Sequence, residues 1–403
     1  MKILEINKFY NSKRGADKHF LDVIALLKEG GHEVADFSMI QDDNEYSQWE
    51  DYFLSPVGYN NSFSIWERIK GAGRMFYSFE AHRKINTVLD EFRPDIVHVH
   101  NLYHQMSPTI LFEIKKRNIP IVMTVHDFKL VNPNHSLRLA GQAYRRCANG
   151  KYYQCILDRC VKNSYALSFL AAAEMYWHSW LGTYSKNIDY YIAPSEFTKK
   201  ILTEWGMDKD KIITLPHFAP TLKGKTAGGH SFAVADSFAL YAGNISREKG
   251  ADTLIGIFTQ QKGMKLYLAG EVEKGFEIPA HANIVYLGFL NTDKLAEYIR
   301  KSKCVISGSE LPETFGLIAL EAITAGKPFL GYDVGAYGEV IQHGKSGLIA
   351  QNKQQLAEFI DTIAKGEIVF SEQEIKMQAQ KYNAHDYCEK IALIFSNAIN
   401  LKK

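Results

Sequence analysis

The sequence predicts an α/β protein with two doubly wound, Rossmann-like parallel-sheet domains. Strand patterns alternate with amphipathic helix patterns from the first residue to about residue 205. A glycine-containing stretch at 219–236 then has neither periodicity, which is typical of a linker. The alternation restarts at Phe238 and continues to Asp333. Two separate sheets, each flanked by helices, explain this order best.

The elements of the first half are predicted as follows. Residues 1–7 form a strand, and a helix starts at Ala16 and ends at Gly30 and Gly31. Its apolar face repeats at i, i+3, i+4 and i+7, at Phe20, Val23, Ile24 and Leu27. Further strands are expected at 32–39, 94–101, 121–127 and 189–195, and Ser195 should cap a helix that reaches Trp205.

The second half repeats the pattern with shorter connections. Strands are expected at 238–243, 264–270, 283–289, 304–307 and 328–333, and helices at 251–261, 292–302 and 315–325. The tail is helical from about Asp386. We therefore expect an N-terminal domain at 1–216 with a cysteine-containing insertion at about 130–185, a C-terminal domain at 217–384, and a helix at 385–403 that packs back on the N-terminal domain. A cleft between the two domains is the expected ligand site.

Composition limits the classes of function. The 403 residues carry a net charge of +2, so bulk electrostatics demand no nucleic-acid partner. No apolar run reaches the ~18 residues of a spanning helix, and the N-terminus starts directly in a strand without a signal-peptide pattern. We expect a cytoplasmic protein, with contact at the inner face of a membrane as an open alternative.

Five cysteines, an odd number, indicate a reducing compartment without a disulfide framework. Cys147, Cys155 and Cys160 nevertheless lie close together in the insertion. A zinc site of these three thiolates completed by His135 or His178 is an alternative to buried free thiols. The spacing fits no standard zinc motif, so we expect no metal.

The most informative segment follows the predicted strand at 304–307. Glu313 and Glu321 stand eight positions apart, on either side of a small-residue turn that opens an apolar helix. The N–H groups and the positive end of such a helix favour a phosphate. Carboxylates can accept hydrogen bonds from sugar or ribose hydroxyls. Together these groups are what a nucleotide-sugar site requires.

Several short motifs occur in one order along nearly the whole chain. They are GHEV at 31–34, PDIVHVH at 94–100, TVHD at 124–127, APS at 193–195, GNISREKG at 243–250, LAG at 268–270, LGF at 287–289, and the two glutamates followed by Gly335 and Glu339. In this order they resemble a retaining glycosyltransferase of family 4 with the GT-B fold. The resemblance implies that His126, Glu313 and Lys249 are catalytic.

The same resemblance implies a donor site that holds a nucleoside diphosphate sugar. Its expected residues are Gly15, Ala16, Gly243, Asn244, Arg247, Lys249, Gly270, Phe289, Leu290, Glu313, Thr314, Phe315, Gly316, Leu317 and Glu321. The family usually has an arginine where this chain has Asn244, and Arg247 is the candidate replacement. The family often has two glycines where this chain has Gly15 and Ala16. Acceptor contacts are expected from Lys13, Arg14, Lys18, His100 and Asn101, whereas His98 is expected to be structural.

The implied reaction moves a sugar from a UDP- or GDP-linked donor to a saccharide acceptor, without a divalent metal. Lipid-linked saccharides of a surface polysaccharide are the expected acceptors. A nucleotide-dependent oxidoreductase is disfavoured, because no G-x-G-x-x-G opens the first strand–helix unit. A non-catalytic nucleotide-sugar-binding protein with a degraded phosphate site stays open because of Asn244.

Two aromatic segments, 66–83 and 165–184, suit a membrane interface by composition. For the second we rather expect a core helix with an aromatic edge, with docking on a membrane surface as the alternative.

Overall fold

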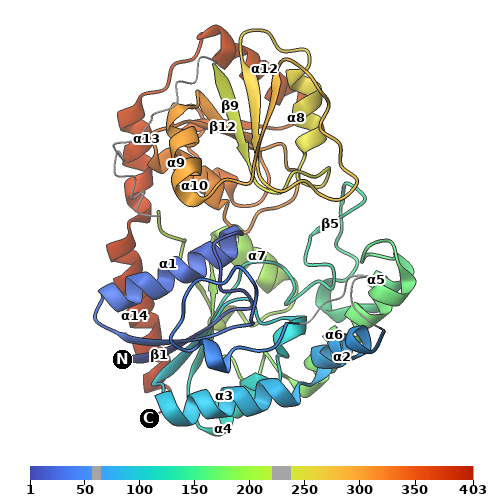
Figure 1. Ribbon diagram of the computed structural model, residues 1–403, viewed down its shortest axis with the longest axis vertical. Coiled ribbons are helices and arrows are strands. Elements are labelled where there is room, and N and C mark those ends of the chain that lie inside the picture. The colour runs from blue at the N-terminus through green and yellow to red at the C-terminus, as the bar shows by residue number, and fades with distance from the viewer. Residues whose placement is uncertain (57–64, 220–236, 403) are drawn as a thin grey trace. The chain divides into compact units, whose positions relative to one another are not determined.

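The computed structural model of the protein describes residues 1–56, 65–219 and 237–402, with the side chains of 65–70 excepted. The chain divides into two compact units (Figure 1). Unit 1 is Met1–Pro216 with His385–Lys403, and unit 2 is His217–Ala384. The predicted linker lies outside the described residues from position 220 onward. Each unit contains one six-stranded sheet, as the alternating pattern predicts.

Unit 1 is built on a sheet whose neighbouring strands all pair in parallel. In sheet order the strands are β2 Glu33–Phe37, β1 Lys2–Ile6, β3 Ile96–Val99, β4 Ile121–Thr124, β7 Tyr190–Ala193 and β8 Ile212–Thr214. A small hairpin of β5 Arg138–Leu139 and β6 Gln142–Ala143 lies in the insertion. The strand β4 is shorter than predicted, so that Val125, His126 and Asp127 lie in the loop beyond its carboxyl end.

The helices of unit 1 follow the sequence signals closely where caps are present. They are α1 Gly15–Glu29, α2 Ile65–Phe76, α3 Phe79–Phe92, α4 Ile110–Lys116, α5 Tyr153–Leu157, α6 Tyr165–Leu181, α7 Glu196–Glu204 and α14 Ala384–Asn400. Ser195 accepts a hydrogen bond from the Thr198 N–H and so caps α7, as predicted. The predicted apolar face of α1 is buried.

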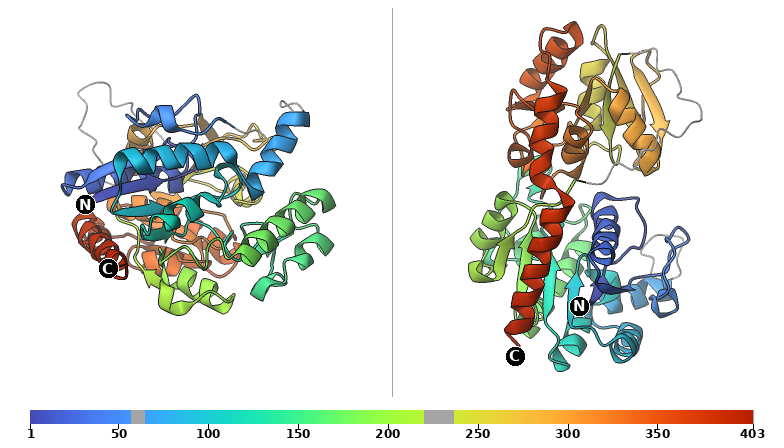
Figure 2. Two further views of the ribbon diagram at one scale, coloured as in Figure 1. Left: turned by 90° about the horizontal axis from the view of Figure 1, so that it is seen from below. Right: turned by 90° about the vertical axis from the view of Figure 1, so that its left-hand side faces the viewer.

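The last helix, α14, belongs to the first unit (Figure 2). The Phe395 ring packs on the His98 ring of β3, with centroids 5.3 Å apart. The Tyr387 ring meets the His19 ring of α1 edge-on, at 5.7 Å. Helices α1 and α14 therefore cover the face of the sheet on which His98 lies.

Unit 2 repeats the parallel plan. In sheet order its strands are β11 Ile284–Gly288, β10 Lys265–Ala269, β9 Phe238–Ala242, β12 Cys304–Ile306, β13 Phe329–Tyr332 and β14 Gly347–Ala350. Its helices are α8 Ala251–Phe258, α9 Thr292–Lys301, α10 Leu317–Thr324, α11 Tyr337–Val340, α12 Lys353–Lys365 and α13 Glu372–Ala379.

Alternate residues of these strands point into two apolar layers, one on each face of the sheet. Ala239, Leu266 and Ile306 pack with α8 and α12 in one layer. Leu240, Val305 and Phe329 pack with α9, α10, α11 and α13 in the other. Figure 1 shows α8 and α10 on opposite sides of the sheet. A strand buried on both faces reads as a continuous apolar run, which is why these strands were readable from the sequence.

The predicted helix at 315–325 begins two residues late, at Leu317. Gly316 has a φ of 92°, in the left-handed region, so Phe315 and Gly316 lie in the turn before the helix.

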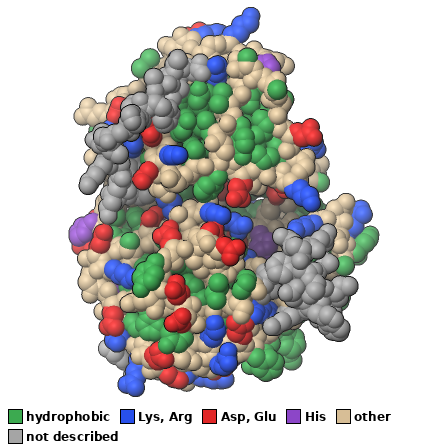
Figure 3. Space-filling view, viewed as in Figure 1, with side chains coloured by type: hydrophobic (Ala, Val, Ile, Leu, Met, Phe, Trp, Pro, Cys, Tyr) green, Lys and Arg blue, Asp and Glu red, His purple; other side chains and the backbone are tan. Residues whose placement is uncertain are grey.

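Charges of both signs are interspersed over the visible face of each unit (Figure 3), in line with the small net charge. Within the described residues, no helix combines the length and the low polarity needed to cross a bilayer.

Candidate functional site

The first turn of α10 forms one half of the candidate site in unit 2. The strand β12 ends at Ile306, and the chain then passes through Glu313 to the turn at Gly316. A Cβ on Gly316 would lie 2.6 Å from a ring carbon of Tyr337, so only glycine fits this turn. The N–H groups of the first helical turn have no acceptors inside the helix, which makes this end suitable for an anion.

Lys249 and Glu313 form an ion pair at the same place. The Lys249 Nζ lies 2.7 Å from the Glu313 Oε1, and both side chains keep more than a quarter of their surface exposed. The Lys249 backbone N–H donates to the Ser246 hydroxyl, at 3.2 Å, which holds the loop that carries the ammonium group. The two residues are 64 positions apart in sequence, and the sheet order β9-β12 brings their loops together.

Glycines allow the loops to touch through their backbones. A Cβ on Gly250 would lie 1.8 Å from the Gly308 carbonyl oxygen. One on Gly270 would lie equally close to the Gly243 carbonyl oxygen, and one on Gly335 would lie 2.3 Å from the Glu313 backbone nitrogen and oxygen. The Ala336 N–H also donates to the Glu313 carbonyl, at 3.0 Å. The Glu313 backbone is therefore fixed by the packing of these loops, and its carboxylate is held by the ion pair with Lys249.

The other predicted donor residues of unit 2 are distributed around this core. Asn244 and Arg247 are exposed on the loop that carries Lys249, and the Tyr241 hydroxyl donates to the Asn244 carbonyl at 2.7 Å. Phe289 is about half exposed just beyond β11. Glu321 is 8% exposed on α10. Because Glu313 balances Lys249, Arg247 is the cationic side chain of the 243–250 loop for which the described residues provide no ion pair.

Unit 1 contains a second candidate site at the carboxyl ends of β3 and β4. The register of β1 on β3 sets Glu5 opposite His98. The two Glu5 carboxyl oxygens lie 2.9 Å from the His98 Nδ1 and 3.2 Å from the His100 Nε2. The His100 Nδ1 lies 2.8 Å from the His126 Nε2. All of these except the partly exposed His126 are fully buried.

This arrangement changes the interpretation of two residues. We expected His100 to contact an acceptor, but its side chain is fully buried behind that of His126, because the strand ends one residue before it and its ring turns toward Glu5. Asp127 follows His126 in the TVHD motif, where an acidic neighbour could orient the histidine ring. Asp127 instead accepts from the Lys129 N–H at 2.8 Å and pairs with His135 at 3.5 Å.

The environment keeps His126 neutral near pH 7. Burial lowers the pKa of His126 to about 4, and the Asp127 charge opposes that shift only in part. Burial also raises the pKa of Glu5, while the His98 hydrogen bond acts in the opposite direction. A neutral imidazole both donates and accepts hydrogen bonds, which suits a residue that contacts a hydroxyl.

The loop before α1 is less basic in effect than its sequence suggests. The Lys13 Nζ is paired with Asp43 at 2.7 Å, and the Arg14 guanidinium lies over the Phe9 ring at 5.0 Å. Gly15 is exposed in the first turn of α1, and Ala16 and Lys18 beside it are partly exposed. The Asn101 N–H donates to the Asn7 side chain at 3.1 Å, which ties this residue to the end of β1.

Several polar residues near this loop were not singled out from the sequence. The Asn7 amide donates to Asp17 at 2.9 Å, and burial raises the pKa of Asp17 to about 6. Burial likewise lowers the pKa of Lys8 to about 8. The signal available in the sequence was weak, since polar residues directly after a buried strand are also common in ordinary loops.

A cavity of about 510 Å³ in unit 1 was also not foreseen. Its wall includes the buried ion pair of Lys129 with Glu174, at 2.9 Å, and the aromatic rings of Tyr191 and Trp205. Glu174 also accepts from the His104 ring at 2.9 Å, and the positive charge of Lys129 helps to hold the pKa of this carboxyl low against the effect of burial.

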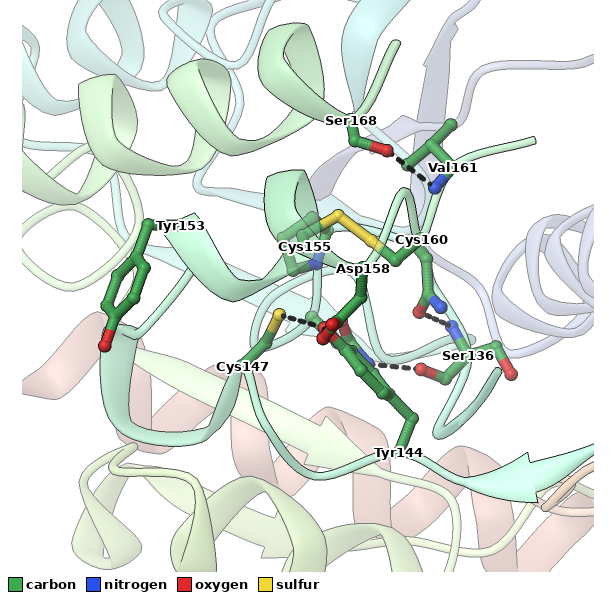
Figure 4. The surroundings of a disulfide bond; sticks show 12 residues. Ser136, Tyr144, Cys147, Tyr153, Cys155, Asp158, Cys160, Val161 and Ser168 are labelled. Atoms are coloured by element: carbon green, nitrogen blue, oxygen red, sulfur yellow. Dashed lines mark hydrogen bonds between the residues drawn. A yellow bond between two sulfur atoms is a disulfide. The ribbon is translucent and has the colours of Figure 1, made fainter. Parts of the chain in front are cut away.

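The cysteine cluster differs from our expectation. Cys155 and Cys160 are joined by a disulfide, because the turn after α5 brings their Cα atoms to 4.9 Å (Figure 4). Cys147 is a buried free thiol beside the Tyr144 hydroxyl, at 3.4 Å, and Tyr144 in turn donates to Asp158. The prediction of no disulfide was wrong, and the alternative of a three-thiolate zinc site is not supported. His178 bonds the Thr183 hydroxyl and the Met75 carbonyl instead of the cysteines.

The two aromatic segments have different surroundings. In the first, the side chains of 65–70 lie outside those described, while Arg74 and His82 are buried in pairs with Glu80 and Glu113. The second forms α6, whose polar Ser168, Glu174 and His178 are buried. Its aromatic residues face outward: Tyr165, Phe169, Tyr176, Trp177 and Trp180 are between 40% and 73% exposed. Its buried face also carries Ala172 and Met175, which belong to the apolar core of unit 1, so α6 is a core helix with an aromatic edge whose buried face includes polar side chains.

Comparison with known proteins identifies the family. The sequence model described as "Glycosyltransferase Family 4" matches residues 13–221, more than half of the chain, and the one described as "Glycosyl transferases group 1" matches 228–386. An uncharacterised 42.6 kDa protein of the cps region of Klebsiella pneumoniae is 24% identical over 368 residues, which cover 84% of this chain and 87% of that protein.

Solved structures give the fold. Sucrose-phosphate synthase from Thermosynechococcus elongatus aligns over the full length of both chains with a TM-score of 0.69 at 15% identity. The Anabaena protein HepE, solved in complex with UDP and glucose, aligns over 98% of this chain and all of its own with a TM-score of 0.65 at 15% identity. The predicted fold class, two Rossmann-like parallel-sheet domains of the GT-B type, is confirmed.

Proposed function

The chain belongs to Glycosyltransferase Family 4, and we propose that it transfers a sugar from a UDP- or GDP-linked donor to a saccharide hydroxyl with retention of anomeric configuration. The observation that carries the proposal is the ion pair of Lys249 with Glu313 beside the glycine turn that opens α10. A cation and a row of backbone N–H groups suit a diphosphate, and the carboxylate suits the hydroxyls of the sugar. HepE, solved with UDP and glucose, supports a nucleotide sugar as the kind of donor.

Each donor-site residue has a role in this proposal. The N–H groups of Thr314, Phe315, Gly316 and Leu317 hold the diphosphate, Lys249 and Arg247 neutralise it, and Glu321 binds the ribose. Glu313 binds sugar hydroxyls, and His126 contacts a hydroxyl near the reacting carbon. Gly15, Ala16, Gly243 and Gly270 let backbone approach the ligand, and backbone beside Phe289 and Leu290 contacts the base.

Charge on the departing diphosphate is stabilised by these fixed groups, so we propose that no divalent metal takes part. The acceptor hydroxyl attacks on the face that the diphosphate leaves, and an oxygen of the leaving phosphate takes its proton. The sugar thereby keeps its configuration without a carboxylate nucleophile of the kind used by retaining hydrolases.

The acceptor is proposed to be a saccharide carried on a lipid, in the synthesis of a surface polysaccharide. The relative in the cps region of Klebsiella pneumoniae supports this biological setting. Lys13, Arg14, Lys18 and Asn101 are the proposed contacts for its anionic portion.

The test combines binding with turnover. Thermal shift with UDP, GDP and their common sugars should identify one base through a concentration-dependent rise in Tm. The matching nucleotide sugar is then incubated with a panel of saccharides and lipid-linked saccharides, and NMR of the product gives the anomeric configuration. We expect transfer with retention in excess EDTA. Donor binding without transfer to any acceptor would favour the binding-protein alternative, and an inverted product would overturn the mechanism.

We also propose that the aromatic face of α6 rests on a membrane surface. Arg159 lies over the Tyr165 ring at 5.4 Å and Lys162 beside it is exposed, so basic groups border the face. Trp, Tyr and basic side chains together favour an anionic interface. In co-sedimentation, the protein should bind vesicles of phosphatidylglycerol and phosphatidylcholine, and W177S/W180S should not. Equal binding of the double variant would exclude this face.

A further inference from the structure

Five side chains form one continuous path of hydrogen bonds through the interior of unit 1. The Thr124 hydroxyl lies 2.8 Å from the His98 Nε2, and the His98 Nδ1 lies 2.9 Å from the Glu5 Oε1. On the other side of Glu5, its Oε2 lies 3.2 Å from the His100 Nε2. The His100 Nδ1 lies 2.8 Å from the His126 Nε2. The path links three neighbouring strands, and it ends at the histidine proposed to contact the sugar.

Each link of this path needs one proton, and an ionised Glu5 determines where each proton lies. A carboxylate can only accept, so the His98 Nδ1 and the His100 Nε2 must both carry hydrogen. These two nitrogens lie 3.3 Å apart and both face the carboxylate. A neutral imidazole has one N–H, so the His100 Nδ1 is then an acceptor, and the proton between the two rings must be on the His126 Nε2.

We propose that Glu5 is a positioning residue that fixes His126, through His100, in the tautomer with hydrogen on Nε2. The inference rests on the proposed function, in which His126 contacts the sugar. The Glu5 carboxylate touches His98 and His100 and reaches His126 only through the second of them. The His100 and His126 rings are nearly parallel, with 18° between their planes. Contact with His100 therefore defines the orientation of the His126 ring as well as the position of its proton.

The surroundings favour this arrangement. Glu5, His98 and His100 are 0% exposed, and the rings of Phe20 and Phe395 pack against His100 and His98. A polar chain in such a place must be satisfied throughout, because a buried polar group without a hydrogen-bond partner destabilises the folded state. Two N–H donors that converge on one carboxylate favour its charged form and oppose the burial that raises the pKa of Glu5.

Two other states of the same cluster, a protonated Glu5 and a bound divalent cation, predict different tautomers. A protonated Glu5 would donate to one of the two histidines, which would reverse that branch alone. A divalent cation bound by Glu5, His98 and His100 would take the lone pairs of His98 Nδ1 and His100 Nε2, and would move hydrogen to the His126 Nδ1.

The first experiment reads the protons directly. Long-range ¹H–¹⁵N spectra of the full-length, histidine-labelled protein without substrate, assigned with single His variants, report which ring nitrogen carries hydrogen. We expect hydrogen on Nδ1 of His98 and on Nε2 of His100 and His126. Hydrogen on Nδ1 of His126 overturns the proposal, and reversal of all three rings identifies a cation site, to be verified by elemental analysis. No substrate is present, so this result stands whether or not transfer is found.

The second experiment connects the tautomer to the reaction. In Glu5→Gln the amide has one oxygen and one NH₂ group, so one of the two facing histidines must reverse. Where His100 and hence His126 reverse, kcat should fall about tenfold or more, with the donor KM unchanged, because a hydrogen bond to the sugar is lost. Where only His98 reverses, kcat should stay near the wild-type value.

A fall in kcat without a change at His126 would reduce Glu5 to a structural role and overturn the proposal. Retained tautomers at all three rings in Glu5→Gln would do the same. Thr124→Val is the matched control: it removes the hydroxyl at the far end of the path, so it should lower Tm while the His126 tautomer stays as in the wild type. If Glu5→Gln does not fold, the wild-type spectrum alone decides the proposal.

Discussion

The candidate sites of the two units are formed by different kinds of chemical group. In unit 2 the site depends on backbone: glycine pairs let loops touch, and partly exposed side chains, Lys249 and Glu313, meet at a helix end. In unit 1 the site depends on fully buried polar side chains, Glu5, His98 and His100, which hold a single partly exposed ring. A close backbone contact leaves no room for an added atom. A path of hydrogen bonds tolerates a substitution that keeps each donor and each acceptor in place. The two sites should therefore fail in different ways when they are mutated.

The largest expected effect comes from Lys249→Ala. Loss of the cation that we propose neutralises the departing diphosphate should lower kcat/KM by roughly 10²–10³-fold. The free energy of unfolding should change by only about 0–1 kcal/mol, because the pair with Glu313 is partly exposed. Steady-state kinetics and urea unfolding separate the two quantities, with the exposed Lys274→Ala as control. A loss of stability without loss of rate would make Lys249 structural.

Gly335→Ala should show how strictly the backbone contact is required. The residue has a φ of 62°, and its new Cβ would lie 2.3 Å from the Glu313 backbone. We expect roughly 3 kcal/mol of destabilisation and weaker donor binding, measured by urea unfolding and thermal shift. Gly344→Ala is the control: its φ is 79°, but nothing lies within 4 Å of the new Cβ. It should cost only about 1 kcal/mol, and equal losses in both variants would dismiss the contact.

The pH dependence of stability should reveal His126 of unit 1. The pKa of His126 is lowered to about 4 in the folded protein, so between about pH 6.5 and pH 4 the unfolded chain binds a proton that the folded chain does not. The contribution of His126 to stability is thus present above pH 6.5 and is lost as the pH falls to 4.

Other buried histidines, such as His104 with its pKa lowered to about 4, act in the same direction. The measurement is therefore the difference between the wild type and His126→Asn in Tm, recorded from pH 7.5 to pH 4.5. The variant should lose less stability on acidification than the wild type. Parallel curves would show that His126 titrates normally.

Arg247→Ala should have the smallest effect. Its side chain is exposed on the loop of Lys249. If it replaces the charge that Asn244 lacks, the apparent KM for the donor should rise by several-fold, about 1 kcal/mol, at unchanged kcat. The effect should shrink at high salt. An unchanged KM would assign Arg247 to the ordinary surface.

The sequence predicted the fold and unit 2 better than unit 1, for a physical reason. Strands buried on both faces and capped helices leave local patterns, so Ser195, Phe238 and the turn at Gly316 could be interpreted directly. Lys249 and Glu313, which pair with each other, also lie in recognisable sequence motifs. By contrast, the role of Glu5 can be inferred only from the register of β1 on β3, which sets it opposite His98. A single acidic residue in an apolar strand carries no sign of that partner.

The insertion was the least predictable part. Helix α6 buries its polar residues and exposes its aromatic ones, because Glu174 joins Lys129 and His104 in the interior. Composition favoured a core helix with an aromatic edge, but it gave no sign that Ser168, Glu174 and His178 would lie on the buried face. The disulfide of Cys155 and Cys160 was likewise not deducible from an odd number of cysteines.

The placement of α14 has a consequence for how the protein is made. The ribosome emits the whole of unit 2 between β1 and α14, yet Phe395 and Tyr387 of α14 cover His98 and His19 in unit 1. During synthesis the nascent first domain thus presents an uncovered sheet face while the whole second domain is translated and folds. Its completion must await α14, so a stop codon just before the codons of α14 would damage a domain encoded far upstream of it.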